Sequence, residues 1–388
     1  MLVSLALKSG RQHSGKLIGI MALVLGSLSL FVVAAACSAE PPPPIPPEEV
    51  PKLGFSSAVP QKHEGTVGVP RLPDGLTYKD VIPPGKYDEP DVLVLDPSEK
   101  YLYFVGKGED GPVYRVELAS GGIIQLTKGL HRLGGIGFYE PGNMLVVGEE
   151  GTGAGPQERK LGFWYPVKPD VPDQPHPEPL RAMGQYRAEG FQVVGRDTIY
   201  LVEDLPQGGH VYKYVLDSPP DLTKGTLYVL KKDEGWIKTA FLQAPDTGKE
   251  GTAFAQAEGI RLGPDGKLYM VVSAEAENKI VTIDPNTGKI TDFVTTRIKG
   301  TKGFERPDQI AFNPQGVLFI GEDVDVGDIW AALPDGPDED TLSDGVFRLA
   351  TGLPHVQGLQ FTKDGSTFYV AQKGLVDSII AITGFKYR

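Results

Sequence analysis

From about residue 90 to the C-terminus, the chain repeats one pattern of apolar and polar positions. An acidic residue opens a short apolar run, a turn with glycine or aspartate follows, and a second run rich in β-branched and aromatic residues ends in acid. Runs of this length around such turns predict β-hairpins. The clearest copies are residues 187–204, 257–273 and 307–323, and looser copies begin at Asp91, Gly135 and Gln357.

The spacing of the repeat predicts how the hairpins are arranged. The opening and closing positions lie 14 residues apart in the copies that begin at Gly135, Glu189 and Asp308. Successive copies begin 44 to 69 residues apart, which suits sheets of about four strands with insertions. Six such units predict an all-β fold, a six-bladed β-propeller. Since the last unit supplies only about three strands, we expect a segment from residues 64–84 to complete its blade and close the ring.

The acids of the repeat are the candidate functional residues. In a propeller the first strand of each blade lines the channel and the second returns to the same end, so the acids that open and close these strands should meet around one mouth. Such a ring of like charges is costly unless a cation lies in it. Carboxylates suit Ca²⁺, whereas six histidines and one cysteine argue against zinc. The candidate metal ligands are Glu149, Glu150, Glu189, Glu203, Glu258, Asp308, Glu322 and Asp323, with Asp91 beside them.

An alternative is that these acids cap strand ends and never meet. Asp325 and Asp328, in a loop without the full calcium-loop pattern, are additional candidates for ligands. Two insertions, 151–182 and 230–256, are expected on the carboxylate face, where they would either wall a substrate pocket or be merely decorative.

The N-terminus predicts export. Residues 1–36 combine a basic start with a long apolar run that ends in alanines before Cys37, which is typical of a lipoprotein signal with lipidation at that cysteine. An ordinary signal peptide cut near Cys37 and a retained anchor helix are the alternatives. Residues 37–63 predict a Pro-rich linker and residues 64–388 the propeller. We therefore expect an exported protein, lipid-anchored to the outer face of the cell membrane or in the periplasm.

The charge pattern limits the partners. A net charge of −12 excludes nucleic acid, whose phosphates it would repel. The cations Arg132, Arg187 and Arg306 stand just before channel-opening positions, where a guanidinium could clamp a small anionic substrate. The alternative is that each pairs with a neighbouring acid. The sequence lacks a nucleophile elbow and a phosphate-binding glycine loop.

Several of these segments resemble PhoX-type alkaline phosphatases. The similar segments are 187–191, 199–204, 211–215, 221–227, 257–260, 306–310, 321–323 and 379–384. The resemblance implies an exported six-bladed propeller that binds calcium and iron in its channel and hydrolyses phosphate monoesters. By position, it implies metal ligands at Glu150, Glu189, Glu258 and Asp308, and phosphate contacts from Arg187 or Arg306.

Two departures from the family bear on function. The family phosphatases carry an iron-ligating cysteine before the paired glutamates, and the corresponding stretch 134–143 has none. The signal also lacks the twin arginines that are usual in the family. Three interpretations stay open: a metal-dependent phosphoesterase, a calcium-dependent lactonase-like hydrolase, and a non-catalytic calcium-binding propeller lipoprotein.

Overall fold

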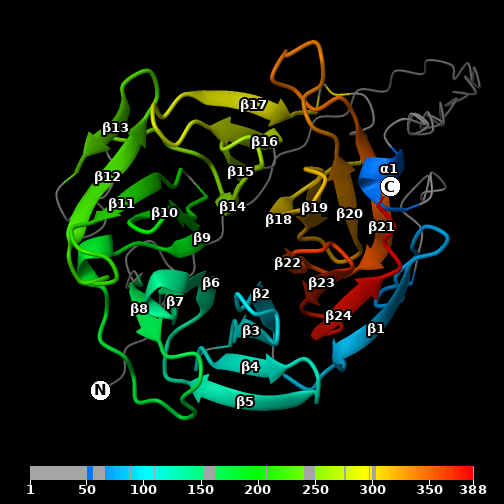
Figure 1. Cartoon of the computed structure of the whole chain (residues 1–388), viewed down its shortest axis with the longest axis horizontal. Helices are drawn as coiled ribbons and strands as arrows, with labels where there is room; N and C mark the ends of the chain where they lie inside the picture. Colours follow the sequence, from blue (N-terminus) through cyan, green and yellow to red (C-terminus); the bar gives the residue numbers. More distant parts are fainter. Residues whose placement is uncertain are drawn as a thin grey trace, which may run out of the picture. The chain divides into compact units, whose positions relative to one another are not determined.

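The computed structural model describes residues 50–55, 66–87, 89–108, 110–151, 162–206, 208–239, 250–274, 277–296, 298 and 303–387. Within these residues, six antiparallel sheets are arranged around a central axis (Figure 1), which confirms the predicted six-bladed propeller. The innermost strands contact one another around the whole ring, in the order β2, β6, β9, β14, β18, β22 and back to β2. The expected signal segment 1–36, Cys37 and most of the expected linker lie outside the described residues.

The blades are numbered here in chain order from their inner strands. Blade 1 consists of β2 (Pro90–Leu95), β3 (Tyr101–Gly106), β4 (Val113–Glu117) and β5 (Gly122–Thr127). Blade 2 consists of β6 (Leu133–Tyr139), β7 (Met144–Glu149) and β8 (Trp164–Val167). Blade 3 consists of β9 (Ala188–Val194), β10 (Thr198–Glu203), β11 (Val211–Leu216), β12 (Gly225–Lys231) and β13 (Gly235–Lys238).

The second half of the ring has the same plan. Blade 4 consists of β14 (Ala257–Leu262), β15 (Leu268–Ala274), β16 (Glu277–Ile283) and β17 (Ile290–Val294). Blade 5 consists of β18 (Pro307–Phe312), β19 (Leu318–Glu322), β20 (Gly327–Ala332) and β21 (Val346–Leu353). Blade 6 consists of β22 (Val356–Phe361), β23 (Thr367–Gln372), β24 (Ser378–Thr383) and β1 (Thr77–Ile82). The short helical elements are α1 (Val50–Leu53), η1 (Glu140–Gly142) and η2 (Arg181–Met183).

The hairpins form where the turn residues predict them. Gly266 and Gly316 follow Pro-Asp and Pro-Gln, and both adopt a positive φ, of 79° and 80°. This left-handed conformation is accessible to glycine at little steric cost. The middle strands are buried on both faces because each lies between two neighbouring blades; Val105 of β3, for example, packs in one cluster with Val147 of β7. The core therefore fills the spaces between blades.

The ring closes through the N-terminal strand, as predicted. Strand β1 pairs with β24 in antiparallel register, with Thr77 opposite Thr383 and Lys79 opposite Ala381. Residues 50–55, inside the expected linker, also pack against the propeller. Leu53 is fully buried in the cluster that contains Phe385, and the Asn313 side-chain amide donates a hydrogen bond to the Lys52 carbonyl at 2.8 Å.

Glycines after the inner-strand acids bring neighbouring blades close together. A Cβ on Gly190 would lie 2.7 Å from the carbonyl oxygen of Glu258 in the next blade. A Cβ on Gly259 would lie 2.9 Å from the carbonyl oxygen of Asp308. No side chain fits at these distances, so the recurring acid-glycine pair has a structural reason. The glycine admits the next blade, and the acid in front of it lies close to the corresponding acid of that neighbouring blade.

Candidate metal centre at the channel mouth

Three layers of side chains surround one mouth of the channel, and each blade contributes one residue to each layer. The inner layer is the second residue of each inner strand: Asp91, Gly134, Glu189, Glu258, Asp308 and Gln357. In each blade, one residue of the second strand pairs with the first residue of the inner strand, and the residue directly after it belongs to the second layer. These second-layer residues are Lys107, Glu150, Asp204, Ser273, Asp323 and Lys373. The entry layer precedes each inner strand: Glu89, Arg132, Arg187, Gln256, Arg306 and His355.

One backbone contact fixes this arrangement in every blade. The N–H of each second-layer residue donates to the carbonyl of the entry-layer residue of the same blade, for example from Glu150 to Arg132 at 2.8 Å and from Asp323 to Arg306 at 2.8 Å. Five of the six entry-layer residues have positive φ values between 40° and 48°, with Arg187 the exception. The chain thus turns sharply at the mouth before each inner strand.

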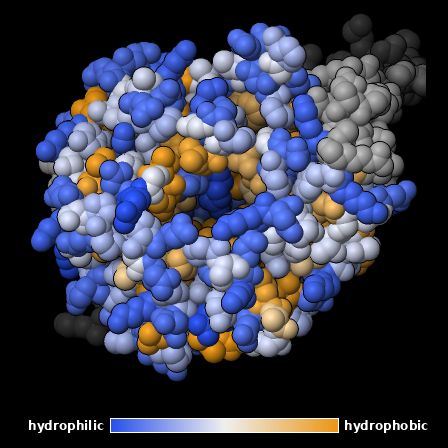
Figure 2. All heavy atoms as spheres, viewed as in Figure 1, coloured by the Kyte–Doolittle hydropathy of each residue, from blue (hydrophilic) through white to orange (hydrophobic). Residues whose placement is uncertain are grey.

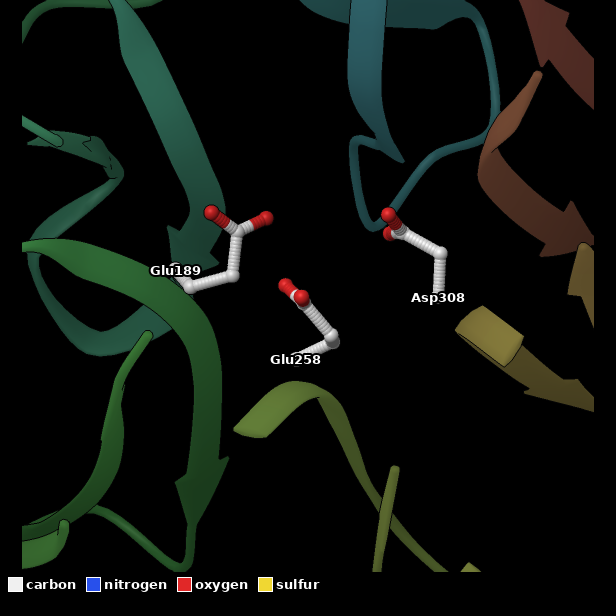
Figure 3. A group of neighbouring side chains, drawn as sticks. All are labelled: Glu189, Glu258 and Asp308. Carbon is white, nitrogen blue, oxygen red and sulfur yellow. The ribbon is translucent and has the colours of Figure 1, made fainter. Parts of the chain in front are cut away.

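Three inner-layer carboxylates converge. Glu189, Glu258 and Asp308 come from neighbouring blades 3, 4 and 5 and point toward a common space (Figure 3), with one oxygen of each within 4.8 Å of the others. All three residues are buried. Among the described residues, the carboxylates of Glu189 and Glu258 have neither a hydrogen bond nor an ion pair, and Asp308 accepts one hydrogen bond, from Gln357 Nε2 at 3.1 Å. Buried carboxylates without partners are costly, so this cluster is incomplete without a cation or protons.

The electrostatics of the cluster agree with this geometry. Burial raises the pKa of Glu189 and that of Glu258 well above the usual range, and neighbouring acids, Glu150 for the first and Asp204 for the second, raise them further. Burial and the nearby Asp323 raise the pKa of Asp308 to about 7. In the absence of a metal, Asp308 therefore takes up a proton near neutral pH, and protonation of Glu189 and Glu258 is favoured as well.

A second group of charges beside the cluster is held together by ion pairs, although Asp91 Oδ1 is buried without a hydrogen-bond partner. Lys107 Nζ lies 2.7 Å from Glu150 Oε1 and 3.1 Å from Asp91 Oδ2. Arg187 Nη2 lies 2.8 Å from Glu150 Oε2, and its Nε lies 3.0 Å from Asp204 Oδ2. Burial alone would raise the pKa of Glu150, but the attraction of Lys107 and Arg187 outweighs burial and lowers it to about 2. Glu150 is therefore ionised throughout the physiological range.

The rim on the side of blades 5 and 6 holds a third group. Asp323 Oδ1 lies 2.6 Å from His355 Nδ1, and Asp323 Oδ2 lies 3.2 Å from Arg306 Nη2. The other ring nitrogen of His355 lies 3.1 Å from Asp325 Oδ1. Burial raises the pKa of Asp323, but Lys373 and His355 lower it more, so its net pKa is below the usual value. About half of the Arg306 side chain is exposed.

The three groups share one cavity. It has a volume of about 320 Å³, which is large enough for a phosphate ester head group. The described residues that line it are Glu89, Lys107, Arg132, Arg187, Glu189, Asp204, Gln256, Glu258, Arg306, Asp308, Asp323 and Lys373. Figure 2 shows the hollow at the centre of the ring from one face, with hydrophilic residues in its depth and hydrophobic residues along parts of its wall.

The structure corrects the expected position of three acids. Glu149, Glu203 and Glu322 close second strands, but none of them lines the cavity. Glu149 accepts from the His131 N–H and the Tyr165 hydroxyl. The physical reason is strand alternation: successive side chains point to opposite faces, so only the residue after each of these acids reaches the mouth.

The other two acids have similar surroundings. Glu203 contacts His210 Nδ1 and accepts from the Tyr212 hydroxyl. Glu322 accepts from Trp330 Nε1 at 2.7 Å and from two backbone N–H groups. For Glu149, Glu203 and Glu322, the alternative of a strand-end role is therefore the better description.

Asp325, Asp328 and the two insertions were further candidates for the site. Asp328 is buried in an ion pair with Arg348 and lies away from the cavity, while Asp325 contacts His355 at the rim. Of the described residues in the two insertions, only Gln256 lines the cavity. The expectation that both insertions wall the pocket is not met by their described residues.

Sequence reasoning missed the two lysines and the glutamine of the layers. Lys107, Lys373 and Gln357 occupy the same positions in the repeat as the acids of other blades. The register of the repeat could have found them, because Lys107 stands where blade 2 has Glu150. Only acids were predicted at these inner-layer and second-layer positions, whereas the predicted cations Arg132, Arg187 and Arg306 all belong to the entry layer.

The residues of the cluster fit a divalent cation. Calcium binds oxygen ligands at roughly 2.3–2.6 Å, so ligand oxygens around one ion lie up to about 5 Å apart. The oxygens of Glu189, Glu258 and Asp308 meet that limit. A second group of acids, Asp335, Asp338 and Asp344, also has oxygens within 4.8 Å of one another, but two of these residues are exposed.

Among the described residues, no helix is long and apolar enough to cross a lipid bilayer.

Comparison with solved structures extends the fold assignment. PhoX of Pseudomonas fluorescens, in complex with the transition state analogue vanadate, has a TM-score of 0.60 and 14% identity over 83% of this chain and 97% of that one. A protein provisionally described as a gluconolactonase has a TM-score of 0.50 and 14% identity over 80% and 93% of the two chains. A luciferin-regenerating enzyme has a TM-score of 0.50 and 13% identity over 81% and 100%. At these identities, the similarity concerns the fold.

Comparison by sequence gives a match to one family over part of the chain. No curated protein matches the chain. Residues 126–289, from the end of blade 1 to the turn before the last strand of blade 4, match the family model described as alkaline phosphatase PhoX. Together with the propeller fold shared with PhoX, this match confirms the resemblance of the chain to the PhoX alkaline phosphatase family.

Proposed function

We propose that this protein is a divalent-metal-dependent phosphoesterase that hydrolyses phosphate monoesters at the channel mouth, with Ca²⁺ as its metal. The observation that carries the proposal is the buried cluster of Glu189, Glu258 and Asp308, two of whose carboxylates have no partner among the described residues. The match of residues 126–289 to the PhoX family supports a phosphate ester as the substrate.

In this proposal the three carboxylates hold the metal. When bound, a divalent cation would polarise the phosphoryl group and neutralise its charge. Asp204 and Asp323 line the same cavity and lie next to the cluster, so they are further ligand candidates. Glu150 is held by Lys107 and Arg187 and, in our proposal, keeps these two cations in place.

The two arginines that the sequence singled out have different proposed roles. Arg187 is bound on two of its nitrogens by Glu150 and Asp204, so it orients acids of the second layer. Arg306 has one acidic partner and half of its side chain exposed, which leaves N–H groups at the rim for an anionic substrate.

Calcium alone, without iron, suits these residues best. The single cysteine of the sequence is Cys37, and the stretch 134–143 has no thiol. The cluster itself offers carboxylate oxygens, which are hard ligands. The lack of a thiol ligand for iron favours, as a second candidate function, a calcium-dependent lactonase-like hydrolase. A non-catalytic calcium-binding propeller is the third.

Metal analysis and hydrolysis assays separate these functions. The purified protein would be analysed for calcium and iron, and then assayed on p-nitrophenyl phosphate and on a simple lactone, before and after chelation. Our proposal expects calcium, phosphate ester hydrolysis, loss on chelation and recovery with Ca²⁺. Hydrolysis of the lactone alone would support the second function, and bound calcium without any turnover would support the third.

A matched pair of variants connects the activity to the cluster. Glu258→Gln should abolish calcium binding and hydrolysis together, because it removes the charge of a ligand and keeps its shape. Glu178→Gln changes an exposed glutamate outside the cavity and should leave both unchanged. Equal calcium binding in the two variants would contradict the assignment of the cluster as the metal site.

Export and lipid anchoring complete the proposal. We propose that Cys37 carries a lipid that holds the protein at the outer face of the cell membrane or in the periplasm. The support is the sequence pattern of residues 1–37. The Cys37→Ala variant should lose incorporation of labelled fatty acid and leave the membrane fraction, while membrane retention of this variant would favour a retained anchor helix.

A further inference from the structure

The charges around the mouth are distributed unevenly. Blades 3, 4 and 5 contribute Glu189, Glu258 and Asp308 to the inner layer. The adjoining blades 6 and 1, whose inner strands β22 and β2 are in contact, contribute Lys373 and Lys107 to the second layer. The cavity thus has an acidic arc that fits a cation and, facing it, a basic arc. A ligand that bridges the two arcs would carry a negative charge.

The two lysines of the basic arc differ in their partners. Lys107 contacts two carboxylates, and about a tenth of its side chain is exposed. Lys373 has no carboxylate within 4.0 Å among the described residues, and its Nζ donates one hydrogen bond, to Gln357 Oε1 at 2.5 Å. Since an ammonium group has three N–H donors, Lys373 has donors left for a ligand in the cavity.

Gln357 couples this ammonium group to the metal cluster. Its side chain is buried, its carbonyl accepts from Lys373, and its Nε2 donates to Asp308 Oδ2 at 3.1 Å. Because an ammonium group only donates and a carboxylate only accepts, the neighbours determine the orientation of the amide. One rigid amide therefore fixes the position of Lys373 relative to a carboxylate of the cluster.

The arginines at the mouth are less available. Arg187 is paired with Glu150 and Asp204, and Arg132 lies 3.7 Å from Glu150 with half of its side chain exposed. Arg306 is paired with Asp323 at the rim. Among the described cations that line the cavity, Lys373 is the one without an acidic partner within 4.0 Å.

We infer that Lys373 is the anion-binding residue in the interior of the cavity, with Arg306 at the rim, and contacts the phosphoryl oxygens of a phosphate monoester, or of inorganic phosphate, bound between it and the acidic arc. Gln357 acts as a positioning residue that holds Lys373 at a fixed place beside Asp308. The inference deepens the proposed function and rests on it for the class of substrate. It concerns binding and involves no further chemical step.

Titration calorimetry with inorganic phosphate tests the inference on the calcium-loaded, full-length protein. Lys373→Met keeps the length of the side chain and removes its charge, and we expect phosphate to bind about tenfold more weakly, as for the loss of one charge-assisted hydrogen bond. Lys373→Arg keeps the charge and should recover part of the affinity. Lys128→Met, at an exposed lysine outside the cavity, is the control and should bind phosphate like the wild type.

Calcium titration and thermal unfolding of the same variants exclude a general defect. Lys373→Met should bind calcium and unfold like the wild type. Equal phosphate affinity in Lys373→Met and the wild type would overturn the inference, even if the protein hydrolyses phosphate esters. Absence of phosphate binding by the calcium-loaded wild type would overturn it as well. Phosphate binding that depends on Lys373, without turnover of a phosphate ester, would support the inference and contradict the proposed hydrolysis.

Discussion

Gly134 and Glu189 share one place at the channel mouth. Gly134 occupies the inner-layer position of blade 2, where other blades carry an acid or an amide, and a Cβ built on it would lie 2.4 Å from Oε2 of Glu189. The carboxylate of Glu189 thus fills the space that a blade 2 side chain would need. Its direction toward Glu258 and Asp308 depends on the absence of a side chain at this position.

The first prediction is that Gly134→Ala weakens calcium binding. The added methyl group would also lie 2.8 Å from the Ala188 carbonyl oxygen, so backbone as well as the Glu189 carboxylate must move. We expect calcium affinity to fall at least tenfold and the free energy of unfolding by about 1–3 kcal/mol, as is usual for overpacking. Calcium titration calorimetry and chemical denaturation measure the two effects.

Gly108→Ala is the matched control for this substitution. No heavy atom lies within 4 Å of a Cβ on Gly108, and its φ is not in the left-handed region. We expect this variant to match the wild type in calcium affinity and to differ in stability by less than about 0.5 kcal/mol. If Gly134→Ala bound calcium as tightly as Gly108→Ala does, the packing of Glu189 against Gly134 would not matter for the site.

The second prediction separates acids of the cluster from acids that cap strands. Glu322 accepts hydrogen bonds from Trp330 Nε1 and from the N–H groups of Glu305 and Asp328. Glu322→Ala leaves these donors without an acceptor, so we expect a loss of at least about 2 kcal/mol in unfolding free energy. The calcium stoichiometry of the folded fraction should not change.

Glu258→Gln should weaken calcium binding without lowering stability, which is the opposite of the result expected for Glu322→Ala. Its carboxylate has no donor among the described residues and has a raised pKa caused by burial and by Asp204, so a neutral amide relieves repulsion in the metal-free protein. We expect the metal-free variant to be more stable than the metal-free wild type and to gain little from added calcium. Thermal unfolding with and without Ca²⁺ measures both. A less stable metal-free variant would argue that the Glu258 carboxylate has a structural partner.

The third prediction concerns pH. Asp308 has a pKa of about 7 in the folded protein against an ordinary value of 3.8, and the pKa of Glu189 is well above 4.5. Between these ordinary values and pH 7, the metal-free folded state binds more protons than the unfolded chain. Its stability should therefore fall as pH rises from 5 to 8.

Calcium should reverse this trend. A bound cation favours the ionised carboxylates, so the gain in melting temperature on adding Ca²⁺ should be small at pH 5 and larger at pH 8. Glu150, whose pKa is lowered to about 2, stays ionised over this range and contributes no slope. Thermal unfolding of the chelated and the calcium-loaded protein at several pH values is the measurement. Metal-free stability that rises steadily from pH 5 to 8 would contradict the assigned pKa shifts.

The sequence predicted the fold well because the relevant signals are local. Glycine turns such as those at Gly266 and Gly316 have a definite conformation, and the similar distance from the start of an inner strand to its partner, as from Ala188 to Glu203 and from Pro307 to Glu322, follows from hairpins of similar length. The missing strand of the last blade could be inferred because an open edge must be covered. Each of these arguments uses neighbouring residues or a count of strands.

The site was predicted less completely, because it depends on register and on contacts between blades. Glu149 and Glu150 are adjacent in the sequence, yet the first points at Tyr165 between strands and the second at Lys107 in the cavity. A shift of one residue reverses the face of a strand residue, and the composition of the repeat does not fix that register. The coupling of Lys373 to Asp308 through Gln357 joins residues of two blades and has no local signal.

The last prediction concerns closure of the ring. Strand β1 is the outermost strand of blade 6, and Lys79 and Asp80 lie opposite Ala381 and Ile380 of β24. Replacing both Lys79 and Asp80 by proline removes two successive backbone N–H groups, one of which faces β24 because successive N–H groups of a strand point to opposite sides, so the pairing is interrupted. We expect a loss of about 2–3 kcal/mol in unfolding free energy, as for backbone groups left without a hydrogen-bond partner, measured by chemical denaturation. The control with Lys79→Ala and Asp80→Ala, which keeps both backbone N–H groups at exposed positions, should cost less than about 1 kcal/mol. Equal stability of the two variants would mean that pairing of β1 with β24 contributes little to holding the six blades together, and the convergence of Glu189, Glu258 and Asp308 would then rest on contacts between the inner strands alone.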